Sequence, residues 1–185
     1  MSESVGRFTA SGLRAKGGEI SCWIFENSTV GLERSLFWSL ILEFEPVSEE
    51  DGTSMTCDWI PWKFRHWKEM DGVILTAKYG EDGIEGSFYV YEHYPMENVT
   101  LAIRHIRDNL FELEMEMTVN YNNSEYSASE SHLVVKGCAI VPFAGLYLGE
   151  GISFDEAVEF IELSAFERET SKNEFGRDYY KPKII

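Results

Sequence analysis

Hydrophobic and polar residues alternate without interruption along residues 111–121. The odd positions are phenylalanine, leucine, methionine, valine or tyrosine, and the even positions are glutamate, threonine or asparagine. Neighbouring side chains of a strand point to opposite faces, so this pattern predicts a strand with one buried and one solvent-facing side. The solvent-facing side carries Glu112, Glu114 and Glu116 in a row, with no basic residue to balance them. Residues 99–106 precede this strand, and we expect the two segments to form a hairpin.

Further segments rich in β-branched and aromatic residues predict additional strands. These segments are 8–15, 20–25, 35–45, 62–67, 73–79, 84–91 and 133–141. The turn sequence Gly80-Glu-Asp-Gly83 lies between two of them, so we expect 73–79 and 84–91 to pair as a hairpin.

Glycine and proline predict where strands end. Gly17-Gly18 is expected to form a turn, as is the glycine-rich segment 145–151. Pro95 and Pro142 are expected to interrupt strands, because proline has no amide hydrogen to donate to a neighbouring strand.

One helix is predicted, after residue 152. Ser153 and Glu156 have the spacing of a capping box, in which each side chain bonds the other residue's backbone amide. An apolar stripe at helical spacing follows. It consists of Phe154, Ala157, Val158, Ile161 and Ala165.

The order of these elements predicts the fold class. Strands follow one another and the one helix comes last, which favours an antiparallel β-sheet or sandwich of about seven to nine strands over alternating βαβ units. We expect a mainly β or α+β protein with the C-terminal helix packed on the sheet. Residues 1–185 are expected to form a single domain, with 1–6 and about 170–185 extended or loosely ordered.

The net charge narrows the choice of partners. With 32 acidic and 16 basic residues the chain carries a formal charge of -16. Such a surface repels nucleic acids and anionic membranes and attracts basic proteins. Cys22, Cys57 and Cys138 are far apart, and we expect three buried, reduced thiols. The first residues lack the pattern of a secretory signal, which predicts a cytoplasmic protein.

No catalytic motif, cofactor motif or metal-ligand spacing is present. The histidines do not follow a metal-binding pattern, and no serine lies in a nucleophile elbow. His93, beside Glu92, is a candidate acid or base, although neighbouring positions in sequence are weak evidence for catalysis. The sequence therefore predicts neither cofactor nor metal and favours a protein that is not an enzyme.

The leading functional hypothesis is a small acidic binding protein that caps a basic protein partner, in the manner of an antitoxin or immunity protein. Glu112, Glu114 and Glu116 would steer the partner electrostatically. Trp62 and Trp67 would anchor it, because exposed tryptophans are common at interfaces.

The alternative is a β-sandwich or barrel enzyme or small-ligand carrier with an aromatic pocket. Its lining residues would be Trp59, Trp62, Tyr89, Tyr91 and His93. A third alternative is a homodimer formed through an open sheet edge.

Overall fold

The fold is mostly β, and the ten strands of its described residues build one continuous sheet. In this computed structural model the described residues are 10–46, 52–90, 92–120, 132–173 and 176–184. The strands are β1 (Ala15–Asn27), β2 (Leu32–Phe44), β3 (Thr53–Ile60), β4 (Ile74–Lys78), β5 (Glu85–Val90), β6 (Glu92–Arg107), β7 (Leu110–Asn120), β8 (His132–Leu148), β9 (Phe166–Lys172) and β10 (Asp178–Pro182).

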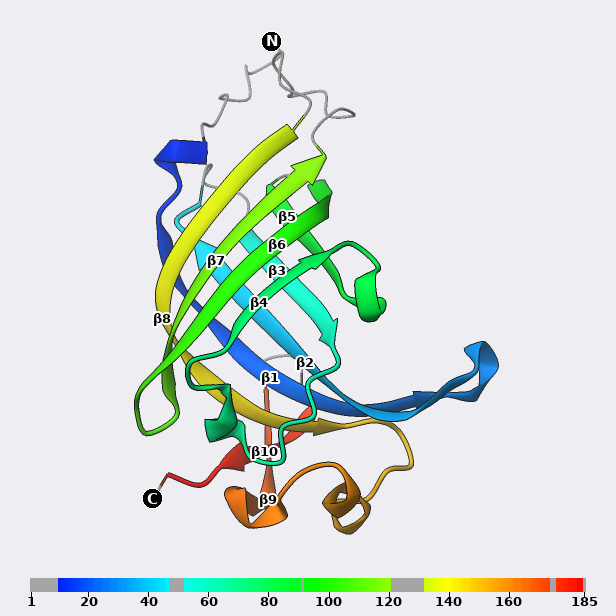
Figure 1. Ribbon diagram of the computed structural model, residues 1–185. Coiled ribbons are helices and arrows are strands. Elements are labelled where there is room, and N and C mark those ends of the chain that lie inside the picture. Colours follow the sequence, from blue (N-terminus) through cyan, green and yellow to red (C-terminus); the bar gives the residue numbers. More distant parts are fainter. Residues whose placement is uncertain (1–9, 47–51, 91, 121–131, 174–175, 185) are drawn as a thin grey trace.

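Seven strands close into a barrel (Figure 1). Neighbours in the order β1-β2-β3-β5-β6-β7-β8 pair antiparallel. The barrel is completed by a parallel ladder in which Ile20–Ile24 of β1 lie beside Phe143–Leu148 of β8. The prediction of a mainly β protein is confirmed, but the strands form a closed mixed barrel with additional strands instead of the antiparallel sheet or sandwich that the order of elements predicted.

Side chains fill the interior of the barrel. Along the wall strands the inward positions are mostly apolar and alternate with outward positions, as the period of two requires. Trp38, Leu40, Leu113, Met117 and Phe143 are all 0% exposed. The alternation in residues 111–120 is confirmed, with the odd positions buried and Glu112, Glu114 and Glu116 on the outer face.

The predicted hairpin between 73–79 and 84–91 is wrong. β4 pairs instead with residues 98–102 of β6, and β5 lies between β3 and the first residues of β6. β5 has Phe88 and Val90 fully inside the barrel, and it supplies β3 with its second neighbour. If β5 paired with β4 in a local hairpin, Phe88 and Val90 would leave the barrel interior and β3 would lose its second neighbour. Long-range burial therefore outweighs the turn signal at Gly80–Gly83.

Two prolines lie inside strands, contrary to the prediction. Pro95 of β6 is opposite Ser87 of β5, and shortly after it β6 changes its neighbour to β4. Pro142 of β8 is opposite Leu110, the first residue of β7, and from Phe143 onward β8 pairs with β1. Each proline therefore lies where a long strand changes partners, and there the missing amide hydrogen costs little.

Three glycines that predicted turns also lie inside strands. Gly18 of β1 has φ 145°, and a Cβ atom there would lie 1.9 Å from the carbonyl oxygen of Ile41. Gly145 of β8 has φ 143°, with its Cβ position 2.3 Å from the carbonyl oxygen of Tyr180. Glycine at these positions permits close approach of neighbouring backbones. Gly17 belongs to β1 as well.

The segment 8–15, predicted as a strand, contains a 3-10 turn at Ala10–Gly12. Residues 8–9 lie outside the described part.

The predicted C-terminal helix is wrong. In its place are two short 3-10 segments, η5 (Asp155–Glu159) and η6 (Leu163–Ala165). The capping box does form, since the Ser153 amide donates to Glu156 Oε2 at 2.8 Å and the Glu156 amide donates to Ser153 Oγ at 3.4 Å.

Arg65 explains why the helix does not continue. Its guanidinium donates to the carbonyl oxygens of Glu159 and Val158 at 2.6 and 2.8 Å, and its own carbonyl accepts from the Glu162 amide at 2.6 Å. A continuing α-helix would need the Val158 carbonyl to accept from the Glu162 amide. Both groups are already bonded elsewhere, so the helix ends after about one turn.

The C-terminal elements lie at one end of the barrel. β9 and β10 pair with each other, and β10 joins the sheet at Tyr180, opposite Leu146 of β8. Figure 1 shows this hairpin (orange to red) beside η5 and η6 below the barrel wall. Short 3-10 turns complete the described part: η2 (Ser28–Val30), η3 (Trp67–Met70) and η4 (Glu81–Gly83). The predicted strand at 62–67 is wrong, since irregular chain there leads into η3.

Candidate functional site

A β-bulge in β3 shapes the candidate site. Trp38 and Leu40 of β2 pair with Ile60 and Cys57 of β3, so the single residue Ser39 is opposite two residues, Asp58 and Trp59. Trp59 has φ 60°, the left-handed region that side chains rarely adopt. The extra residue lets Asp58 and Trp59 both leave the barrel interior, whereas an unbroken strand would send one of them inward.

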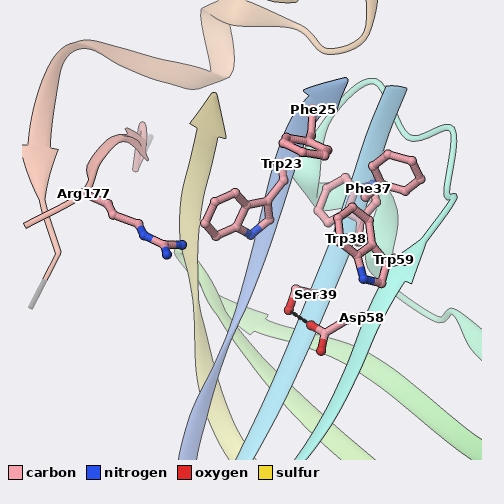
Figure 2. Close-up of a pocket in the computed structure, with 8 residues that line it drawn as sticks. All are labelled: Trp23, Phe25, Phe37, Trp38, Ser39, Asp58, Trp59 and Arg177. Carbon is pink, nitrogen blue, oxygen red and sulfur yellow. Dashed lines mark hydrogen bonds between the residues drawn. The ribbon is translucent and has the colours of Figure 1, made fainter. Parts of the chain in front are cut away.

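Aromatic side chains on the outer face of β1 and β2 meet Trp59. The Trp59 ring centroid lies 5.2 Å from that of Phe37 and 5.9 Å from that of Phe25. Trp23 is the direct cross-strand neighbour of Phe37 and stacks on Tyr147 at 4.3 Å. The rings of Trp23, Phe25, Phe37 and Trp59, drawn in Figure 2, line a hollow of about 360 Å³. A pocket with aromatic walls and few polar groups is the usual form of a small-ligand site.

The carboxyl group of Asp58 is the main polar group of this pocket. It accepts hydrogen bonds from the hydroxyl groups of Ser39 and Thr56. Removal from water raises the pKa of Asp58, the two hydroxyl groups oppose that rise, and the nearby Glu85 carboxylate adds to it. A partly desolvated carboxyl in a hollow is a recognised indicator of a functional site.

Arg177 lies at the rim. It comes from the segment before β10, and its guanidinium carbon lies 5.7 Å from the centroid of the Trp23 ring. Figure 2 shows Trp23 between Arg177 and the other aromatic rings, with the Ser39–Asp58 hydrogen bond beneath them. Trp23 is thus one wall of the pocket and at the same time a surface on which a cation rests.

A second, more polar hollow of about 280 Å³ shares Asp58 with the aromatic pocket. Glu85 is the cross-strand neighbour of Asp58, and farther along the same face the Ser87 hydroxyl lies 3.2 Å from Nδ1 of His93. Thr56 Oγ1 lies 3.3 Å from the Ser87 hydroxyl, so hydroxyl groups connect the two ends of this hollow. His93 therefore lies in this second hollow and does not line the aromatic pocket.

The other residues predicted to line a pocket do not converge. Trp62 packs against the buried Trp38, with ring centroids 6.2 Å apart. Tyr89 lies beside His93 at 4.9 Å, on the part of β5 remote from the bulge. Tyr91 lies outside the described residues. Of the predicted set, only Trp59 belongs to the aromatic pocket.

The glutamate row is less free than the sequence indicated. Glu112 pairs with Arg104 at 2.7 Å and Glu116 pairs with Lys136 at 2.6 Å, since the neighbouring strands supply bases at these positions. Glu114 is the exposed member of the row for which the described residues give no ion pair. The expectation of an unbalanced row is therefore wrong for two of its three glutamates.

Trp67 is not available to a partner. It is 1% exposed, stacks on Phe143 and donates from its indole nitrogen to the Ala165 carbonyl at 3.4 Å. The expectation of three buried thiols also needs correction, because Cys22 and Cys57 are buried but Cys138 is exposed on β8.

The sequence contained a signal for the aromatic pocket. Trp23 and Phe25 alternate with the buried Cys22 and Ile24, so they occupy solvent-facing positions of β1. Large aromatic residues that gather at solvent-facing positions mark candidate binding surfaces. Asp58 and Arg177 had no comparable signal, because a bulge and a distant hairpin bring them to the site.

Among the described residues, no group of three or more histidine, cysteine, aspartate or glutamate side chains could hold a metal ion. The helical segments in that part of the chain are too short and too polar to cross a bilayer. β4 pairs with β6 along one edge, and no strand among the described residues pairs with its other edge. A homodimer through a sheet edge stays a prediction. No family model, curated protein or solved structure matches this chain.

Proposed function

We propose that this protein is a small-ligand binding protein whose site lies on the outer wall of the barrel, at the bulge in β3. The observation that carries the proposal is the hollow that Trp23, Phe25, Phe37 and Trp59 line together with Asp58. It is a form of the aromatic-pocket alternative drawn from the sequence, with a different set of lining residues.

The packing of the barrel favours an outer site over an inner one. Interior side chains such as Leu40, Met117 and Phe143 have no exposed surface, so a ligand inside would have to displace them. The aromatic rings on the outside gain less from packing, since Trp59 remains 38% exposed and its backbone is strained. Strain of this kind persists mostly where function requires the geometry.

Binding without catalysis is the simpler interpretation. His93 and Ser87 are the nearest candidates for acid–base or nucleophilic chemistry, but they lie in the second hollow and the aromatic pocket does not include them. Its polar side chains are Ser39, Asp58 and Arg177, of which the first two are hydrogen-bonded to each other.

The five tryptophans provide a direct test. Each gives a separate indole N–H signal in a nitrogen–proton correlation spectrum, so a screen of neutral, cationic and anionic fragments reports where each fragment binds. A fragment in the proposed pocket shifts the signals of Trp23 and Trp59 in a saturable manner. The signals of Trp62 and Trp67 serve as internal controls, because those side chains lie outside the pocket.

Matched variants complete the test. Trp59→Ala should abolish saturable binding, whereas Tyr89→Ala removes an aromatic ring from the remote part of β5 and should leave it intact. Fragments that shift only Trp62 or Trp67, or a Trp59→Ala protein that binds as well as the wild type, would rule the proposal out.

Capping of a basic protein is the second candidate, and the net charge of -16 favours it. Its contact surface would centre on Glu114, because Glu112 and Glu116 already have basic neighbours. A pull-down from cell extract at low and high salt tests it. A stoichiometric basic partner that dissociates as salt rises, and that Glu114→Gln weakens, supports capping; no partner at either salt contradicts it.

A further inference from the structure

We infer that the ligand of the outer pocket carries a cationic group, an organic ammonium, which lies between the aromatic walls and the Asp58 carboxylate. The inference rests on the proposed function and adds the chemical class of the ligand. Three observations carry it: the acceptor chemistry of the pocket floor, the charges around it, and the cation that already lies on one wall.

The pocket floor has one strong site, the carboxylate of Asp58. Ser39 and Thr56 donate to it, yet a carboxylate has about four lone-pair positions, so acceptor capacity remains for a ligand. A positively charged group beside this carboxylate is attracted by its charge whether or not it carries an N–H, so a quaternary ammonium complements the site as well as a primary one does.

The two carboxylates at the floor of the pocket favour a cation, whereas Arg177 at the rim opposes one. Glu85 is directly opposite Asp58 on β5, and like charges at such a pair of positions are unfavourable. A cation beside Asp58 would relieve this repulsion. Arg177 is the one basic side chain among the described residues that line the pocket, and it lies over Trp23 at the rim.

Arg177 also shows that a wall of the pocket accommodates a positive group. Its guanidinium lies 5.7 Å from the Trp23 ring centroid, within the range of a cation–π interaction. The face of an aromatic ring attracts an ammonium by the same electrostatic effect, and Phe37 and Trp59 provide further rings on the other side of the hollow (Figure 2). Rings on several sides with one carboxylate are a suitable environment for a methylated or alkylated ammonium.

The decisive experiment compares two probes that differ in charge and hardly in shape. Choline carries a trimethylammonium group, and 3,3-dimethyl-1-butanol replaces its nitrogen by carbon. Binding of each to the wild-type protein is followed by the indole signals of Trp23 and Trp59. We expect choline to bind at least about tenfold more tightly than the neutral alcohol, which corresponds to about 1.4 kcal/mol.

Two variants that each remove one negative charge test whether the preference for choline depends on Asp58 itself. Asp58→Asn keeps the side-chain shape but removes the negative charge that attracts the trimethylammonium, so it should weaken choline binding about tenfold while leaving the neutral alcohol unaffected. Glu114→Gln on β7 changes the net charge by the same amount at a distance from the pocket and should have no such effect. Equal weakening by both variants would mean that only the overall charge matters and would overturn the inference.

The outcomes separate this inference from the proposed function. If both probes bind at Trp23 and Trp59 with equal affinity, the pocket is a ligand site but the cationic class is wrong. If anionic or neutral fragments bind there and choline does not, the inference fails in the same way. If no fragment of any charge binds, both the inference and the proposed function fail.

Discussion

Trp59 has a backbone conformation, φ 60°, that glycine adopts without the crowding of a Cβ atom. Comparing two variants separates the effect of the strained backbone on stability from the effect of losing the indole ring. Trp59→Ala and Trp59→Gly both remove the ring, but only glycine relieves the backbone. We expect the glycine variant to be more stable than the alanine variant by about 1 kcal/mol in urea denaturation.

Tyr89 supplies the control for that comparison. It lies in β5, and its φ is not in the positive range. Glycine there should be less stable than alanine by about 0.5–1 kcal/mol, the opposite order. If the two positions gave the same order, the strain at Trp59 would be refuted.

Asp58 gives a prediction on stability and pH. Its pKa is raised above the ordinary value, chiefly by removal from water, so the folded state binds the proton more tightly than the unfolded state does. The protonated form is therefore favoured on folding, and the stability it gives is lost as pH rises through the raised pKa. The amide that replaces this carboxyl in the Asp58→Asn variant does not ionise.

We expect Asp58→Asn to be more stable than the wild type at neutral pH by about 1 kcal/mol, the common size of a single-residue effect. The difference should shrink as pH falls through the raised pKa and vanish below about 3.9, the pKa of an aspartate in the unfolded chain. Urea denaturation of both proteins across this range measures it. A variant less stable than the wild type at neutral pH would show that the hydrogen bonds from Ser39 and Thr56 outweigh the cost of burial.

Arg65 determines how the segment after β8 is folded. Its guanidinium bonds the carbonyl oxygens of Val158 and Glu159, which would otherwise continue a helix. Arg65→Ala should destabilise the protein by about 1 kcal/mol, because two carbonyl groups lose a charged donor at an exposed position. Lys68→Ala, in the neighbouring η3, is the control and should change stability by less than about 0.5 kcal/mol. Equal effects of the two changes would show that Arg65 has no special part in this segment.

Elements whose pattern is local were predictable, and elements that depend on distant partners were not. The period-two pattern of residues 111–120 and the hairpin with 99–106 were correct because inward and outward faces follow directly from sequence. The partner of β4 could not be predicted in this way, because β5 lies between β3 and β6 and β4 pairs with β6 instead. The capping box at Ser153 was correct as a local bond, but the helix predicted from it does not form, because Arg65, far away in sequence, bonds the carbonyl groups that the helix would need.

The filled interior of the barrel leaves little room for added volume. Gly137 of β8 faces inward, and a Cβ atom there would lie 2.8 Å from the Phe44 ring. Gly137→Ala should therefore cost about 1–3 kcal/mol, as overpacking does in other cores. Gly17 has nothing within 4 Å of its Cβ position, so Gly17→Ala should be close to neutral. Chemical denaturation of both compares them, and a harmless Gly137→Ala would mean that the interior yields easily.

The candidate site belongs to the whole molecule more than to any segment. Trp23, Phe37 and Trp59 come from three neighbouring strands, and Arg177 comes from the hairpin that follows the barrel. Sequence alternation could place Trp23 on an outer face, but not Trp59, whose direction depends on the bulge opposite Ser39. The glutamate row was placed correctly, whereas its basic neighbours on β6 and β8 required knowledge of which strands are adjacent.

The parallel ladder between β1 and β8 joins residues far apart in sequence, such as Cys22 and Leu146, and the Cys22 thiol also donates to the carbonyl of Gly145, 123 residues away. On the ribosome β1 is made early and has β2 as its neighbour, but its other edge stays unpaired until β8 has emerged. Unpaired edges associate with other chains, and ladders between distant residues form slowly. The yield of correctly folded protein should therefore depend on translation speed and chaperone protection of that edge more than on the stability of the finished barrel.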